Sequence, residues 1–195
     1  MESFGRKRGP GMIPKIKNIL YATDLTENSA YAFRYAINSA ERHDAHIHIL
    51  HVLKPLRSQI NEYFYPFKPE TIQEEARREL LDEIKKRLEE FCQRELKGNP
   101  ERMRRVASIQ VVEGYPAGTI LDKAEESRAD MMIMGTHGKG WLTHAFLGSV
   151  AESVLQRIKI PVFIIPLPEK TDIGSDNKPG VLQLLAKERP EMCFS

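Results

Sequence analysis

The chain has 195 residues, of which 41% are hydrophobic and 29% are charged, and its formal net charge is +2. We expect one soluble globular domain with a sizeable core, and so small a net charge gives no reason to expect nucleic acid or an anionic membrane as a partner. No apolar run is long enough to cross a bilayer. The only two cysteines, Cys92 and Cys193, exclude a disulfide framework and a cysteine-built zinc site, and they fit a reducing cytoplasm.

The two ends of the chain differ from its middle. Residues 1–12 are basic and lack the apolar segment of a secretory signal, so we expect a flexible leader. Residues 169–195 begin with a polar stretch, and we expect a flexible C-terminal tail. The folded domain is therefore predicted over residues 13–168.

Short apolar runs alternate with amphipathic helical patterns through this domain. The predicted strands are, in order, 17–22, 46–52, 107–112, 130–134 and 161–165. The predicted helices cover 26–42, 70–97, a segment that begins at Pro116, and 148–158, and a long aromatic-rich loop covers 53–69. Strands that alternate with helices predict a doubly wound α/β fold, in which a five-stranded parallel sheet carries helices on both faces.

A glycine-rich loop follows the fourth predicted strand. The apolar run 131–134 ends in Gly135, the loop carries Gly138 and Gly140, and Gly148-Ser149 opens the next amphipathic segment. Glycines let backbone N–H groups approach a phosphate chain, and a helix N-terminus adds free donors and a favourable dipole. This order of strand, glycine loop and helix start is typical of phosphate binding.

Side chains in and after this loop have a structural and a functional interpretation. His137 and Lys139 could contact phosphate, although His137 could equally occupy a permissive loop position. Ser149 and Glu152 have the spacing of a capping box, which predicts Ser149 as the N-cap of the last helix. A helix N-terminus can be capped in this way and still bind phosphate.

Thr23 and Asp24 directly follow the first predicted strand. Asp24 and Glu27 have the spacing of a capping pair, so Asp24 is either a helix cap or a carboxylate of a binding site, where it could help to hold Mg²⁺. In doubly wound sheets, ligands bind beyond the carboxyl ends of the strands, where the strand order reverses. Since the site-like segments follow strands one and four, those strands should be neighbours, which favours the order 3-2-1-4-5.

Histidines cluster around the second predicted strand. Alternation along a strand puts His46 and His48 on one face and His51 on the other, which weakens a metal-site interpretation. Exposed histidines, or histidines with hydrogen-bond partners, are the favoured interpretation.

Ordered motifs over residues 13–166 resemble the universal stress protein family, in its ATP-binding branch. The family pattern of Gly, two residues, Gly, nine residues, Gly and Ser or Thr is met in full from Gly135 to Ser149. Further matching pieces are ILYATD at 19–24, HV at 51–52, EGYP at 113–116 and PVFII at 161–165. Together these motifs are specific, whereas a lone Gly-x-x-Gly would be a weak signal.

The resemblance implies a site for ATP with Mg²⁺ or Mn²⁺ on the phosphates. By similarity, the residues around the adenosine are Ala22, Asp24, Val52, Met134 and Gly135, and those around the phosphates are Gly138, Gly148, Ser149 and Val150. Thr23, His137 and Lys139 join the candidates through their positions in the two site-like segments. The resemblance also implies a homodimer, made by antiparallel pairing of the last strand, 161–165.

The sequence therefore predicts a cytoplasmic, ATP-binding regulatory homodimer. We expect at most slow ATP hydrolysis, because the sequence has neither a Walker A pattern nor a G-x-S-x-G elbow and no evident water-activating base. Bound ATP would order the 136–147 loop and change a surface that an unknown partner protein reads. One alternative is an interaction module without nucleotide, against which the intact glycine pattern argues. Another is an AMP-transferring enzyme of the wider α-hydrolase-like class, which usually has a glycine loop where this chain has 22–24.

Overall fold

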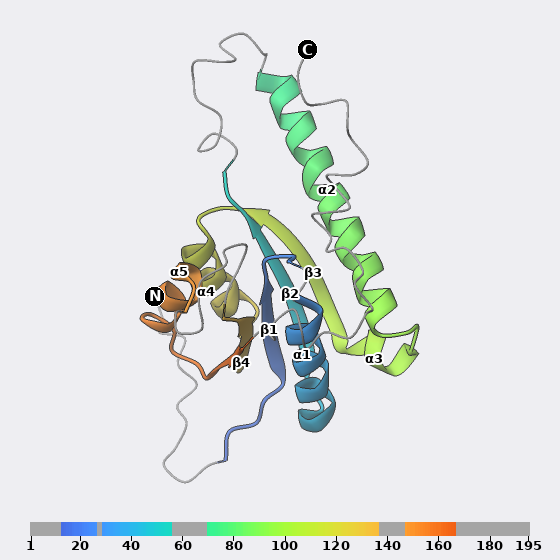
Figure 1. The fold of residues 1–195 in the computed structure, drawn as a ribbon, viewed down its shortest axis with the longest axis vertical. Helices are drawn as coiled ribbons and strands as arrows, with labels where there is room; N and C mark the ends of the chain where they lie inside the picture. The colour runs from blue at the N-terminus through green and yellow to red at the C-terminus, as the bar shows by residue number, and fades with distance from the viewer. Residues whose placement is uncertain (1–12, 27–28, 56–69, 137–146, 167–195) are drawn as a thin grey trace.

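The computed structural model describes residues 13–26, 29–55, 70–136 and 147–166. Their strands form one parallel sheet in the order β3-β2-β1-β4-β5, of which Figure 1 labels β1 to β4. The strands are β1 (Asn18–Thr23), β2 (His46–Leu53), β3 (Val106–Glu113), β4 (Met131–Gly135) and β5 (Val162–Ile165). The helices are α1 (Ser29–His43), α2 (Glu70–Glu95), α3 (Pro100–Arg105), α4 (Pro116–Glu126) and α5 (Ser149–Leu155). The predicted fold class and strand order are confirmed. The predicted leader, the tail and most of the 53–69 loop lie outside the described residues.

Each face of the sheet packs against its own set of helices. Alternate residues of β1 point to opposite faces, so Ile19 and Tyr21 pack with α1 and α2, whereas Leu20 and Ala22 pack with α4 and α5. Figure 1 shows the two helix layers on either side of the sheet. We call these the α1/α2 face and the α4/α5 face. Burial of one large apolar side chain contributes about 1.5–3 kcal/mol to the stability of the folded state. The apolar clusters on the two faces therefore account for much of that stability.

Helix α2 is amphipathic along the part that touches the sheet. Its buried residues recur at helical spacing on one side and are Ile84, Leu88, Phe91 and Cys92, with Leu80 partly buried against the same cluster. Burial raises the pKa of the Cys92 thiol to about 12, which makes it an inert core residue. The first half of α2 extends past the sheet in Figure 1. Among the described helices, none is both long and apolar enough to span a bilayer.

Helix α3 is absent from the sequence prediction, which ended the long helix at residue 97 and placed no helix before the strand 107–112. Lys97 and Gly98 both have positive φ (50° and 64°), and these left-handed residues turn the chain after α2. The Asn99 side chain then accepts hydrogen bonds from the backbone N–H of Glu101 (3.0 Å) and of Arg102 (3.2 Å), and Pro100 follows as the first helical residue. The segment that ends one helix therefore also starts the next.

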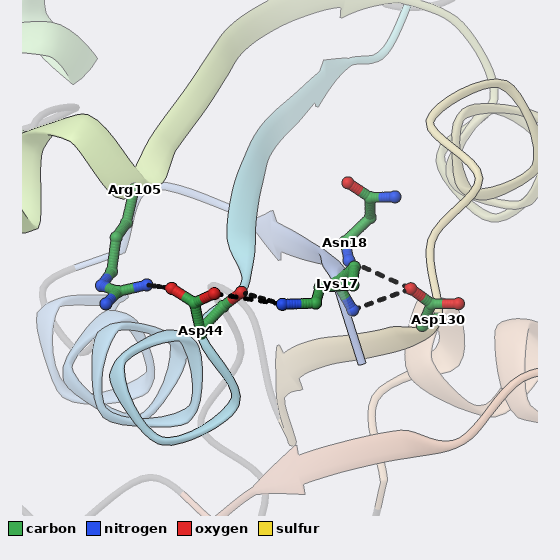
Figure 2. Close-up of polar contacts among 5 residues, drawn as sticks. All are labelled: Lys17, Asn18, Asp44, Arg105 and Asp130. Atoms are coloured by element: carbon green, nitrogen blue, oxygen red, sulfur yellow. Dashed lines mark hydrogen bonds and ion pairs between the residues drawn. The ribbon is translucent and has the colours of Figure 1, made fainter. Parts of the chain in front are cut away.

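Polar groups tie the chain together at the edge of the sheet where the strands begin, which we call the amino edge (Figure 2). One carboxylate oxygen of buried Asp130 accepts hydrogen bonds from the backbone N–H of Lys17 (2.9 Å) and of Asn18 (3.1 Å). The Lys17 ammonium lies 3.1 Å from the Asp44 carboxylate, which also accepts a 3.3 Å hydrogen bond from Arg105. Lys17 and then Arg105 hold the pKa of Asp44 below its ordinary range.

Candidate functional site

The predicted site residues that the structure describes converge at the opposite edge, where the strands end, which we call the carboxyl edge. Strand β1 lies between β2 and β4, and Ala22 is the register partner of both Leu50 and Met134. The chain leaves β1 for α1 on one face and leaves β4 for α5 on the other, so the strand order reverses between them. Such a reversal is where doubly wound sheets bind their ligands. The structure therefore places the two points where the site-like segments begin, after β1 and at the end of β4, at one switch point.

Three predicted adenosine residues share one face there. Ala22 and Met134 are buried within the cluster of the α4/α5 face, and Val52 is partly buried against it. They come from three adjacent strands, β2, β1 and β4. Sequence reasoning placed these residues correctly at one end of the sheet.

Thr23 and Asp24 form a tight turn between β1 and α1. The Thr23 hydroxyl oxygen accepts a 3.2 Å hydrogen bond from the Leu25 N–H. One Asp24 carboxylate oxygen, Oδ1, accepts from the backbone N–H of Thr26 (3.1 Å) and from its hydroxyl (2.9 Å). These bonds close an Asx-turn, which competes with helix formation.

The helix-cap interpretation of Asp24 is therefore wrong. Thr26, the predicted start of α1, is not helical, and Ser29 is the first helical residue among those described. The Tyr21 hydroxyl donates a 2.7 Å hydrogen bond to the Ser29 carbonyl. Leu25 would be the first residue of a helix capped by Asp24, but its φ of 60° is left-handed, so Asp24 does not cap a helix. Glu27, its proposed capping partner, lies outside the described residues.

The second carboxylate oxygen of Asp24, Oδ2, is buried and has no hydrogen-bond partner among the described residues. Leaving a buried acceptor without a partner costs about 1–3 kcal/mol, and native proteins contain few such groups. This oxygen lies at the switch point, next in sequence to β1. A carboxylate oxygen in that state is suited to accept a hydrogen bond from a ligand or to bind a cation.

The two ends of the glycine loop are joined by one backbone hydrogen bond, and its first end is also bonded to β5. The Thr136 N–H donates to the Ile165 carbonyl (3.0 Å), and the Gly148 N–H donates to the Thr136 carbonyl (2.8 Å). The start of α5 is thereby fixed beside the end of β4. The predicted loop residues His137, Gly138 and Lys139 lie between these anchors and outside the described residues.

Helix α5 begins with Gly148 as its N-cap, so the predicted capping box of Ser149 and Glu152 is wrong. Gly148 has extended backbone angles (φ −62°, ψ 148°), and its carbonyl already accepts the 2.9 Å hydrogen bond from Glu152 N–H. Ser149 is therefore the first helical residue and is exposed, and the N-cap Gly148 has no side chain that could cap the helix. Val150 packs against the α4/α5 face. An uncapped helix start offers its N–H groups to an anion.

The histidines of β2 divide between the faces as predicted. His46 is exposed, and His48 is half-buried with its Nδ1 2.9 Å from the Ser108 hydroxyl oxygen. Burial and then the charge of His46 lower the pKa of His48. His51 is buried, and its Nδ1 lies 2.8 Å from the Thr23 carbonyl oxygen, a contact that sequence reasoning missed. Within the described ranges, no three His, Cys, Asp or Glu side chains are grouped to hold a metal ion.

Known proteins are similar to this chain over the folded domain that carries the candidate site. The sequence model of the universal stress protein family matches residues 15–166. Universal stress protein MJ0531 of Methanocaldococcus jannaschii is 32% identical over 156 residues, which cover 79% of this chain and 84% of that protein. Universal stress protein MJ0577 of the same organism is 28% identical over 153 residues, which cover 76% of this chain and 94% of that protein.

A solved structure of the protein MJ0577 has the same fold. It matches with a TM-score of 0.62 at 26% identity, over 80% of this chain and 99% of that one. The family match covers more than half of the chain and includes both site-like segments. The chain therefore belongs to the universal stress protein family.

Proposed function

We propose that this protein binds ATP, with Mg²⁺ or Mn²⁺, at the carboxyl edge of its sheet and acts as a regulatory homodimer with at most slow ATP hydrolysis. The observation that carries the proposal is the buried Asp24 Oδ2, which has no partner among the described residues. A ligand that supplies a donor or a cation to this oxygen relieves its unfavourable burial.

The chemistry around Asp24 supports an adenosine. Ala22, Val52 and Met134 give an apolar surface on one face of three adjacent strands, which suits an adenine ring. A carboxylate oxygen accepts hydrogen bonds and cannot donate them, so Asp24 complements ribose hydroxyl groups or a divalent cation. Gly135 follows Met134 and ends β4.

The backbone at the start of α5 supports phosphate binding. Gly148 caps the helix without a side chain, and Ser149 and Val150 follow it beside the end of β4. Bound phosphates would accept hydrogen bonds from these N–H groups, and the cation would neutralise phosphate charge. The groups that support the proposal are suited to bind and orient a nucleotide, and none of them is suited to activate a water molecule for attack on the phosphate. The proposal therefore includes at most slow ATP hydrolysis.

Calorimetric titration of nucleotide-free protein with ATP and Mg²⁺ tests the site. We expect a dissociation constant of about a micromolar, and a loss of at least tenfold, about 1.4 kcal/mol, for Asp24→Ala. Asp122→Ala, which removes an exposed carboxylate of α4, is the matched control and should bind as the wild type does. Phosphate release from the same samples measures hydrolysis. Wild-type protein that does not saturate up to about 1 mM ATP, roughly −4 kcal/mol, would leave the interaction module as the better function.

The exposed edge of β5 supports the homodimer. Strand β5 is the last in the sheet order and pairs only with β4 among the described strands. Phe163 on this strand is 53% exposed, which is unusual for a large apolar residue in a sheet. Pairing β5 with β5 of a second copy would cover this side chain and satisfy the edge of the sheet.

Light scattering after size exclusion tests the dimer. We expect the wild type to be dimeric and Phe163→Glu to be monomeric, because the new charge would be buried without a partner. Tyr115→Glu changes another exposed aromatic residue, away from β5, and should stay dimeric. A wild type that is monomeric at high protein concentration would contradict this part of the proposal and leave the nucleotide site unaffected.

A further inference from the structure

The turn that carries Asp24 has an unfavourable backbone conformation. Leu25 has φ of 60°, in the left-handed region that residues with a Cβ rarely adopt, yet its side chain is only 1% exposed. A left-handed leucine persists only where the surrounding structure fixes it. Something must therefore hold the turn in place.

His51 makes such a contact from the neighbouring strand. It is the register partner of Thr23, and its Nδ1 lies 2.8 Å from the Thr23 carbonyl oxygen. A carbonyl oxygen can only accept a hydrogen bond, so Nδ1 must carry the proton and donate. The bond fixes the last peptide group before Asp24.

The hydrogen bonds of the turn come from Thr23 and Asp24, the two residues that the Thr23–Asp24 peptide group joins, so they depend on its orientation. The Thr23 hydroxyl oxygen accepts a hydrogen bond from the Leu25 N–H, and Asp24 Oδ1 accepts hydrogen bonds from the backbone N–H and the hydroxyl of Thr26. With Oδ1 committed to Thr26, the carboxylate has one orientation, and Oδ2 is the oxygen left for a ligand. Rotation of the Thr23 peptide would turn the carboxylate away.

We infer that His51 is a positioning residue of the nucleotide site, which fixes the Thr23–Thr26 turn and so aims Asp24 at the ligand. This inference rests on the proposed function for its effect on binding. His51 lies on the α1/α2 face with Ile47 and Ile49, whereas Ala22 and Val52 lie on the α4/α5 face. It therefore acts through the backbone of β1 rather than by touching nucleotide.

Three variants separate this role from simple packing. His51→Leu removes the donor but keeps an apolar side chain in the core. His51→Asn keeps an N–H donor where the imidazole Nδ1 lies, so it should rescue the contact. His48→Leu is the matched control, because it deletes the 2.9 Å bond to Ser108 from the same strand but at a distance from the turn.

Two measurements are made on each variant. The first is the dissociation constant for ATP with Mg²⁺, which we expect to rise about tenfold in His51→Leu and to stay near wild type in His51→Asn and His48→Leu. The second is amide hydrogen exchange in nucleotide-free protein, which should become at least about tenfold faster at Leu25 and Thr26 in His51→Leu alone. Unchanged exchange at both amides in His51→Leu would overturn the inference.

The exchange measurement keeps the inference separate from the proposed function. If the wild type binds no ATP, faster exchange in His51→Leu still supports the positioning of the turn while the nucleotide site fails. A measurement on the unaltered protein covers the case in which His51→Leu does not fold. The nitrogen NMR shifts of His51 should report a proton on Nδ1, and a neutral ring protonated on Nε2 alone would overturn the inference.

Discussion

The carboxylates at the two edges of the sheet differ in how fully they are paired with hydrogen-bond donors and cations. At the amino edge, Asp130 binds two backbone N–H groups, and Asp44 binds a lysine and an arginine (Figure 2). At the carboxyl edge, Asp24 binds its own turn through one oxygen, and its other oxygen is buried without a partner in the described parts of the chain. The carboxylates of the amino edge therefore contribute stability, whereas the carboxyl edge keeps an acceptor of the kind that the proposed site requires.

Removing the Asp130 carboxylate should have the largest effect of the carboxylate changes and should act on stability alone. Asp130→Ala leaves the N–H groups of Lys17 and Asn18 without their acceptor, which should lower the free energy of unfolding by about 2–4 kcal/mol. Urea unfolding at one fixed protein concentration measures this, since assembly would otherwise alter the result. ATP affinity should be unchanged, the opposite of the pattern expected for Asp24→Ala.

Asp130→Asn is the control for this prediction. Both N–H groups donate to the same carboxylate oxygen, and an asparagine side chain can keep an oxygen in that position. We expect a loss below about 1 kcal/mol. An Asp130→Ala variant as stable as the wild type, or one that loses ATP binding while folded, would remove the distinction between the edges.

The conformation of Leu25 can sharpen the comparison at the carboxyl edge. Its buried side chain makes both Leu25→Ala and Leu25→Gly destabilising, by about 2–5 kcal/mol. Because φ is 60°, Leu25→Gly should nevertheless be more stable than Leu25→Ala by about 1 kcal/mol. Urea unfolding of the two variants gives this difference directly.

Leu20 supplies the reference pair. It is buried in β1, and it is not among the described residues with positive φ. There Leu20→Ala should be more stable than Leu20→Gly, the usual order in a strand. The same order at Leu25 would show that the turn is not held in the left-handed conformation.

His48 gives a smaller, pH-dependent effect. Burial and the nearby His46 lower its pKa below the ordinary 6.5, so the unfolded chain takes up a proton first as the pH falls. The contribution of His48 to stability is complete above pH 6.5 and is lost as the pH falls through the folded-state pKa. Unfolding of wild type and His48→Gln between pH 7.5 and 5 should show a steeper decline for wild type. Parallel curves would contradict this.

Asp44 should give the smallest effect, because the group is fully exposed. Lys17 and Arg105 lower its pKa from 3.8, so its stabilising contribution is present above that pH and disappears as the pH falls below it. Solvent and salt screen exposed ion pairs. We expect Asp44→Asn to be slightly less stable than wild type at pH 7 in low salt and equal to it near pH 2. A difference that persists at pH 2 would point to another cause.

Much of the fold could be predicted because local patterns and the positions of two segments agree. The apolar run of β4 and the placement of Asp24 and Gly135 after their strands were enough to predict the strand order. The capping predictions for Asp24 and Ser149 were wrong because each considered a side chain without its backbone surroundings. The Asp24 side chain closes an Asx-turn instead of capping a helix. The hydrogen bond from the Gly148 N–H to the Thr136 carbonyl fixes Gly148 in place, and α5 starts directly after it.

The role of His51 could not be predicted, since it depends on the register between two strands. Only the pairing of Thr23 with His51 brings the imidazole to that carbonyl. Helix α3 was missed for a related reason, because Asn99-Pro100 can end one helix and begin another. The roles of His137, Gly138 and Lys139 stay predictions, as do the leader and the tail.

The closure of the glycine loop at its base has a consequence for engineering. Thr136 and Gly148 are joined by one backbone hydrogen bond, and Thr136 is also tied to β5. With its ends fixed in this way, the loop can be exchanged for a longer segment at a small entropic cost, about 0.6 kcal/mol for each doubling of its length. A reporter domain inserted between these two residues would leave the sheet intact, and it would be coupled to the loop that the sequence predicts to bind phosphate. If the proposed nucleotide site is real, such a fusion could serve as a biosensor.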